Sequence, residues 1–194
     1  EMDDRLQKEG AIGARRLLVE RAKETLERLT SAGIQDPEIG RDLVAAYLKL
    51  GDVMGRLGGA NLGRSGEARR SYERALEISR ELTVRYPENE FVREQNAEAL
   101  LRVAGITKTQ GRPEAALALG QEAIRALEGE AGTRMTVARL RLLAAAYHDV
   151  GGTYSQMGKW QEVIAVREKA LATSTQILAS AEATLDDRLR EILA

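Results

Sequence analysis

Apolar residues recur along this chain at intervals of three and four, the spacing that places side chains on one face of a helix. One such stripe consists of Leu43, Tyr47, Leu50 and Met54, and a matching stripe of Ala68, Tyr72, Ala75 and Leu82. The strict alternation that marks strands is absent from the sequence. The pattern therefore predicts an all-α protein built from paired amphipathic helices.

Prolines and glycines divide this pattern into segments. Asp36-Pro37-Glu38 has the form of an N-cap, a first-turn proline and a first-turn acid, and Tyr86-Pro87 closes a long segment. Gly111-Arg112-Pro113 and Gly158-Lys159 have the composition of tight turns. These signals predict helices at about residues 12–32, 37–57, 65–86, 88–110, 113–128, 132–157, 159–180 and 184–193, the last beginning at a capping-box sequence, Thr184-x-x-Asp187.

A helical phrase also repeats. It occurs as Tyr47-x2-Leu50-Gly51-x2-Met54, Leu100-x2-Val103-Ala104-x2-Thr107 and Tyr147-x2-Val150-Gly151-x2-Tyr154. An alanine of the second helix recurs at Ala22, Ala75, Ala123 and Ala170, with spacings of 53, 48 and 47 residues. Repetition at this period predicts stacked helical hairpins in a single domain, 1–194. We divide it into a flanking segment (1–11), a half repeat (12–35), three repeats (36–87, 88–131 and 132–180) and a C-terminal capping helix (181–194).

Small residues occupy one position of each copy: Gly51, Ala104 and Gly151. A glycine inside a helix costs roughly 0.5–1 kcal/mol relative to alanine. Close approach of a second helix compensates for that cost, so we expect all three positions to touch a neighbouring helix.

The repeated phrase, followed by Ala68-x3-Tyr72-x2-Ala75, resembles the tetratricopeptide repeat over about residues 12–180. The resemblance implies a right-handed α-solenoid of antiparallel hairpins whose inner curve binds other proteins. Three positions depart from the family pattern: Gly120 and Arg167 replace an aromatic residue, and Val163 replaces an alanine.

A narrower resemblance rests on the stretches 15–22, 42–53 and 60–63. They are similar to the C-terminal tetratricopeptide region of certain bacterial membrane-anchored serine/threonine protein kinases. This implies that a cytoplasmic kinase domain and one membrane helix precede the fragment, which then lies outside the cytoplasm; without that setting, a cytoplasmic location is expected. The chain itself contains no kinase motif, so we expect no catalysis by this fragment.

Composition narrows the choice of partners. The 194 residues carry a formal net charge of −1 and no cysteine, and 43% are hydrophobic but only 4% aromatic. A nearly neutral chain gives no field for attracting nucleic acid, and no apolar run is long enough to cross a bilayer. Thiolate metal sites are excluded.

Candidate catalytic motifs are weak. Residues 58–65 approach the phosphate-loop pattern, but Arg64 replaces its lysine and no strand precedes it; an enlarged hairpin turn explains the segment better. His148 is the only histidine, so it cannot build a metal site or a triad. Trp160 is expected to pack on the preceding helix. We predict no catalytic residue, metal site or cofactor.

In a tetratricopeptide stack, the inner curve is lined by the residue that follows the first Tyr or Leu of the repeated phrase (Tyr47, Leu100 and Tyr147). Residues at one-turn intervals beyond it line the curve as well. The candidate binding residues with their basic neighbours are Leu48, Asp52, Arg56, Leu101, Arg102, Lys108, His148 and Gln156. We predict a non-catalytic protein-interaction or sensor module of a kinase, with a protein or peptide partner or a second copy of the chain. The alternative is a stand-alone scaffold or adaptor that binds extended peptides.

Overall fold

The computed structural model describes residues 2–31, 36–55, 63–128 and 135–180. Across these ranges the fold is all-α, as predicted, with seven helices and no strand. Their bounds are α1 (Met2–Ser31), α2 (Pro37–Gly55), α3 (Ser65–Arg85), α4 (Glu90–Thr109), α5 (Pro113–Glu128), α6 (Val137–Gln156) and α7 (Trp160–Leu178). The predicted capping helix at 184–193 lies outside the described residues.

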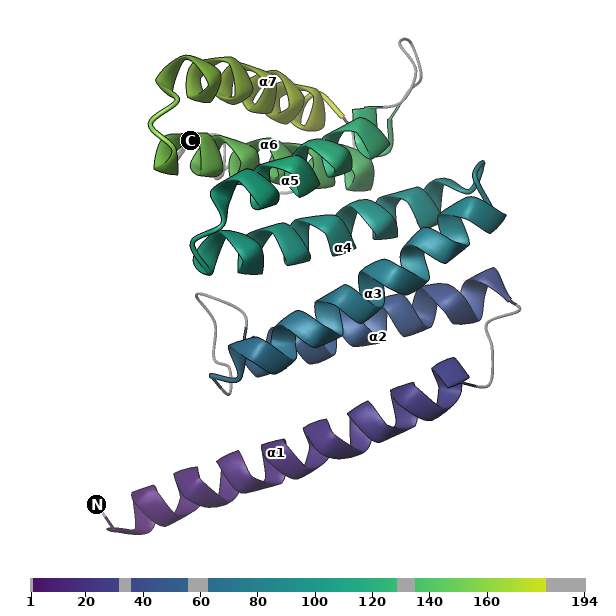
Figure 1. The fold of residues 1–194 in the computed structure, drawn as a ribbon, viewed down its shortest axis with the longest axis vertical. Coiled ribbons are helices and arrows are strands. Elements are labelled where there is room, and N and C mark those ends of the chain that lie inside the picture. Colours follow the sequence, from purple (N-terminus) through teal and green to yellow (C-terminus); the bar gives the residue numbers. More distant parts are fainter. Residues whose placement is uncertain (1, 32–35, 56–62, 129–134, 181–194) are drawn as a thin grey trace. The chain divides into compact units, whose positions relative to one another are not determined.

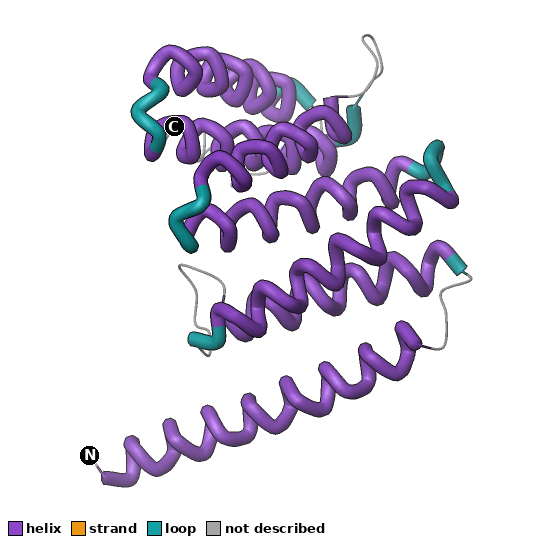
Figure 2. The backbone as a smooth tube through the Cα atoms, viewed as in Figure 1, coloured by secondary structure: helices purple, strands orange, loops and turns teal. Residues whose placement is uncertain are grey.

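The chain divides into two compact units, Glu1–Pro87 and Glu88–Ala194. In the first unit α2 and α3 form an antiparallel hairpin, and α1 packs more lightly against α2. In the second unit α4 pairs with α5 and α6 with α7, while α5 and α4 both contact α6 (Figure 2). Within each unit, helices that are adjacent in sequence pack on one another, which is the packing of helical repeats.

Local signals explain where helices begin. The Asp36 carboxylate accepts a hydrogen bond from the Glu38 amide at 2.7 Å, so the predicted cap before Pro37 is confirmed. Asn89 caps α4 by accepting from Val92 at 3.2 Å, and Thr136 caps α6 in the same way. Because of the Thr136 cap, α6 begins five residues after the predicted position.

Two of the hairpin turns depend on glycine. Gly111 and Gly158 have φ angles of +75° and +72°, which other residues adopt only with strain. These turns lie where the sequence predicted them, between α4 and α5 and between α6 and α7. The core of the α2–α3 hairpin is also as predicted, because both of its apolar stripes are buried.

The predicted contact at the small residues is confirmed for both glycines. A Cβ atom added at Gly51 would lie 2.4 Å from Tyr72 Cε1 of α3, and one at Gly151 would lie 3.9 Å from Val166 Cγ1 of α7. Ala104 is buried, with 6% of its surface exposed. Ala22, which aligns with the buried Ala75, is exposed on α1.

Candidate functional site: a groove between α5, α6 and α7

The candidate residues predicted in the first unit differ in environment. Leu48 is buried, and Asp52 is half-buried and accepts a hydrogen bond from the Tyr72 hydroxyl at 2.7 Å. Asp52 therefore has a structural role in tying α2 to α3. Arg56 lies outside the described residues.

In the second unit the predicted residues are spread over α4 and α6. Leu101 is buried, and Arg102 forms an ion pair with Glu98 at 3.3 Å. Lys108 lines a hollow of only about 10 Å³, roughly the space of one water molecule. His148 and Gln156 are exposed. The binding role of these residues stays a prediction.

A larger concave site lies elsewhere in the second unit, between α5, α6 and α7. It has a volume of about 320 Å³, at the lower end of the range for ligand pockets. We call it the α5–α7 groove and define it by its lining residues: Gln121, Ile124, Arg125, Glu128, Tyr147, Val150, Tyr154, Glu162, Ala165, Val166 and Lys169.

Helical periodicity explains why these residues converge. On each of the three helices the lining residues recur at intervals of three or four, so each helix presents a single face to the groove. Gly120 brings α5 close to α6, because a Cβ atom there would lie 2.6 Å from Val150 Cγ2. The groove is therefore built on closely packed helices rather than on loops.

The floor of the groove is apolar. Ile124, Tyr147 and Val150 are 9%, 5% and 2% exposed, and Val166 and Ala165 form part of the α7 wall. An apolar side chain inserted here would move from water onto an apolar surface. Its burial would contribute a favourable free energy of roughly 25 cal/mol for each Å² of apolar surface removed from water.

Polar contacts close the two ends of the groove. At one end, Gln121 Nε2 donates to the Tyr154 hydroxyl at 2.9 Å and joins α5 to α6. At the other end, the Tyr147 hydroxyl donates to Glu128 Oε1 at 2.6 Å. These bonds fix both tyrosine rings along the groove.

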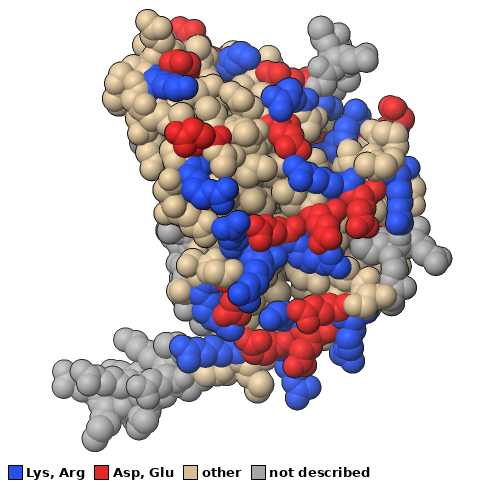
Figure 3. Space-filling model, viewed as in Figure 1, with Lys and Arg blue, Asp and Glu red and all other residues tan. Residues whose placement is uncertain are grey.

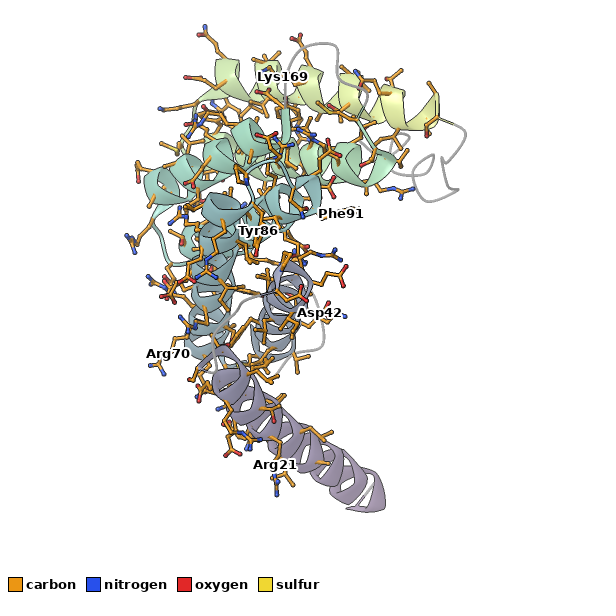
Figure 4. All side chains as sticks on the ribbon, turned by 90° about the vertical axis from the view of Figure 1, so that its right-hand side faces the viewer. Arg21, Asp42, Arg70, Tyr86, Phe91 and Lys169 are labelled. Carbon is orange, nitrogen blue, oxygen red and sulfur yellow. The ribbon has the colours of Figure 1, made fainter. Side chains whose placement is uncertain are left out.

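Lys169 completes the second end from α7 (Figure 4). Its Nζ lies 3.4 Å from Glu128 Oε1 and 5.6 Å from the centre of the Tyr147 ring. Burial of the ring raises the pKa of the Tyr147 phenol, and the Glu128 carboxylate raises it further by accepting the proton in a hydrogen bond. Tyr147 is therefore a neutral hydrogen-bond donor at physiological pH.

The polar side chains that line the groove are those of glutamine, arginine, glutamate, tyrosine and lysine. Its lining contains no serine, threonine, histidine or cysteine to serve as a nucleophile with a nearby base. Among the described residues, no group of three or more His, Asp or Glu lies together in a way that could hold a metal ion.

Arg64, the basic residue of the phosphate-loop-like segment, is engaged by carboxylates. Its guanidinium pairs with Glu67 and, at 2.7 Å, with Glu20 of α1. The hydrogen bond with Glu20, followed by that with Glu67, raises the pKa of Arg64 above its ordinary value. Glu20 and Glu67 therefore compete with an anion for Arg64. Residues 58–62 of the phosphate-loop-like segment lie outside the described ranges.

The expected packing of Trp160 is wrong. Trp160 is the first residue of α7 and is 64% exposed. The side of α7 that packs inward carries Thr173 and Ile177 instead.

None of the groove residues was among the candidate binding residues predicted from the sequence. The predicted positions were counted from the residue after the first Tyr or Leu of the repeated phrase. The groove uses residues of the phrase itself, namely Tyr147, Val150 and Tyr154. The sequence did contain one signal. Tyr147 and Tyr154 are seven residues apart, which places them on one face of the helix, and tyrosine hydroxyls need polar partners when the rings are buried.

Charged side chains elsewhere alternate in sign. Figure 3 shows Lys and Arg interleaved with Asp and Glu on the visible face. Ion pairs such as Arg69–Glu73 and Arg74–Glu77 on α3 account for part of this pattern. It matches the near-neutral net charge of −1.

Comparison with known proteins leaves the family open. No known family profile matches the chain, and no curated protein sequence does. Among solved structures, BtubC (BKLC) from P. vanneervenii is similar, with 21% identity, a TM-score of 0.41, and coverage of 92% of this chain and 79% of that one. MamA MSR-1 C2 has 15% identity and a TM-score of 0.34 over 91% of this chain and 99% of that one.

A third similar structure is the DHF79 filament, with 16% identity, a TM-score of 0.36 and coverage of 95% of this chain and 98% of that one. At these scores none of the three assigns a function to the chain. In the described part of the chain, no helix combines the length and apolar character needed to span a membrane.

Proposed function

We propose that the chain is a non-catalytic protein-binding module whose α5–α7 groove receives an apolar side chain from a partner polypeptide. The observation that carries this proposal is the groove itself: a dry apolar floor between two polar ends, on three packed helices. A volume of about 320 Å³ suits a small number of inserted side chains. The polar ends offer hydrogen bonds to the backbone of the partner polypeptide on either side of the inserted residue.

Peptide selection followed by blocking of the groove tests this function. Peptides selected on the protein from a randomised display library would be measured by fluorescence anisotropy against two variants. Ala165→Trp fills the groove from an exposed position on α7, and Ala172→Trp adds the same ring at an exposed α7 position outside it. We expect loss of binding for Ala165→Trp alone. Equal binding to both variants, or no selected peptide, would refute the proposal.

The wider setting that we propose is the regulatory C-terminal region of a bacterial membrane-anchored serine/threonine protein kinase. It is supported by the sequence resemblance of residues 15–22, 42–53 and 60–63. The reading frame of the parent gene tests it: a kinase domain followed by one apolar segment of membrane length is expected upstream. A complete reading frame without them would favour a stand-alone adaptor.

Self-association belongs to the same proposal. Two copies of the module brought together would place two kinase domains side by side for phosphorylation in trans. Sedimentation equilibrium over a range of concentrations tests this point, and a monomer at every concentration contradicts it.

A further inference from the structure

Two of the four charged side chains that line the α5–α7 groove have partners, and two do not. Glu128 accepts from Tyr147 and pairs with Lys169. Arg125 on α5 and Glu162 on α7 are exposed and have no ion-pair partner within the described ranges 63–128 and 135–180. Their charges are available to a ligand in the groove.

The positions of these two charges follow from the direction of the helices. Both α5 and α7 run antiparallel to α6, so they run the same way along the groove. Glu128 of α5 meets Lys169 of α7 at one end. Counting back seven residues on each helix from this pair, we expect Gln121 of α5 and Glu162 of α7 to lie at one level at the other end.

Arg125 lies one turn beyond Gln121 on the α5 wall. With a rise of 1.5 Å per residue, it is offset from Glu162 by about 6 Å along the groove, on the opposite wall. An extended polypeptide covers that distance in about two residues. The floor below this interval is made by Val150 and Ile124, which are apolar and buried.

We propose that the groove selects polypeptide segments in which an apolar residue is flanked, within two or three positions, by one basic and one acidic residue. The apolar side chain enters above Val150, the basic residue meets Glu162, and the acidic residue meets Arg125. This inference rests on the proposed function and adds to it the chemistry of the partner. A segment with both flanking charges of one sign would meet one attraction and one repulsion.

Charge reversal at each wall tests the proposal. The same display library would be selected on the wild-type protein, on Glu162→Lys and on Arg125→Glu. Two charge reversals outside the groove serve as matched controls: Glu168→Lys on α7 and Arg112→Glu before α5, both at exposed positions. Circular dichroism shows whether each variant is folded.

We expect wild-type selection to enrich the mixed-charge pattern, Glu162→Lys to lose the basic preference, and Arg125→Glu to lose the acidic one. Synthetic peptides from the wild-type pool should bind each groove variant about 3- to 30-fold more weakly, because an attraction becomes a repulsion. The neutral variants Glu162→Gln and Arg125→Gln should show a smaller loss, and the controls none.

Two results would overturn the inference in different ways. Peptides that fail to bind Ala165→Trp but tolerate both charge reversals would show that the groove binds without selecting charge. Peptides that bind Ala165→Trp as well as the wild-type protein would remove the proposed function as well.

Discussion

Gly51→Ala is a direct test of how α2 and α3 pack. A Cβ atom at this position would lie 2.4 Å from Cε1 and 2.6 Å from Cδ1 of Tyr72, distances that side-chain atoms do not tolerate. Tyr72 is only 3% exposed, and its hydroxyl donates to Asp52 at 2.7 Å. The ring therefore cannot retreat without weakening that hydrogen bond or moving α3.

The magnitude follows from two opposing effects. Overpacking of a buried contact costs about 1–3 kcal/mol, while replacing a glycine inside a helix by alanine returns about 0.5–1 kcal/mol. We expect the overpacking to prevail, with a net loss of about 1–2 kcal/mol in the free energy of unfolding.

Gly151→Ala is the matched control, since Gly151 has the same place in its repeat. The nearest atoms to a Cβ there, on Val166 and Arg167, are 3.9 Å away, an ordinary van der Waals contact. This variant keeps the helix gain without the overpacking, so it should be more stable by about 0.5–1 kcal/mol.

Urea unfolding followed by circular dichroism measures both variants. The double variant Gly51→Ala/Tyr72→Leu provides a second check, because a smaller side chain at residue 72 should relieve most of the added clash. A Gly51→Ala protein as stable as the wild type would refute the steric reasoning. So would equal losses in the Gly51 and Gly151 variants.

Three further predictions concern the second unit. The pKa of Tyr147 is raised above the ordinary value of about 10, so the stability that its protonated form contributes is complete below that pH. This contribution falls as the pH rises towards the higher folded-state pKa. Tyr147→Phe should flatten this alkaline decline in urea unfolding, and an unchanged slope would contradict the reasoning. Arg139 is buried and donates from Nε to the Leu127 carbonyl at 2.7 Å, so Arg139→Ala should cost about 2–3 kcal/mol by denaturant titration; a loss below about 0.5 kcal/mol would contradict the bond's importance. Asn89→Ala removes the α4 cap and should cost about 1 kcal/mol in the same assay, whereas Asn89→Gly should cost only a few tenths.

Helices and turns were predictable because their signals are local. The Asp36 cap, Pro37 in the first turn, and the glycines at 111 and 158 each constrain the backbone within a few residues of their own position. The start of α1 at Met2 was missed, since residues before 12 lack a clear apolar stripe and the prediction relied on that stripe.

The groove was much less predictable because its contacts are not local. Tyr147 bonds to Glu128, nineteen residues away, and Tyr154 bonds to Gln121, thirty-three residues away. The sequence separation of neither pair predicts its hydrogen bond. The family pattern predicted binding at the inner-curve positions, whereas the α5–α7 groove lies on the tyrosine positions themselves.

Degeneracy of the repeat explains why the three hairpins differ in what they offer a partner. Counting from the repeat alanines, Tyr72, Gly120 and Arg167 occupy one equivalent position. In the first hairpin the Tyr72 ring fills the space against Gly51, whereas Arg167 in the third is exposed. In the second, Gly120 has no side chain, and Val150 of the following helix occupies the vacated space. Because Val150 also forms the floor of the α5–α7 groove, the absence of a side chain at position 120 lets α5 and α6 approach closely enough to build that floor.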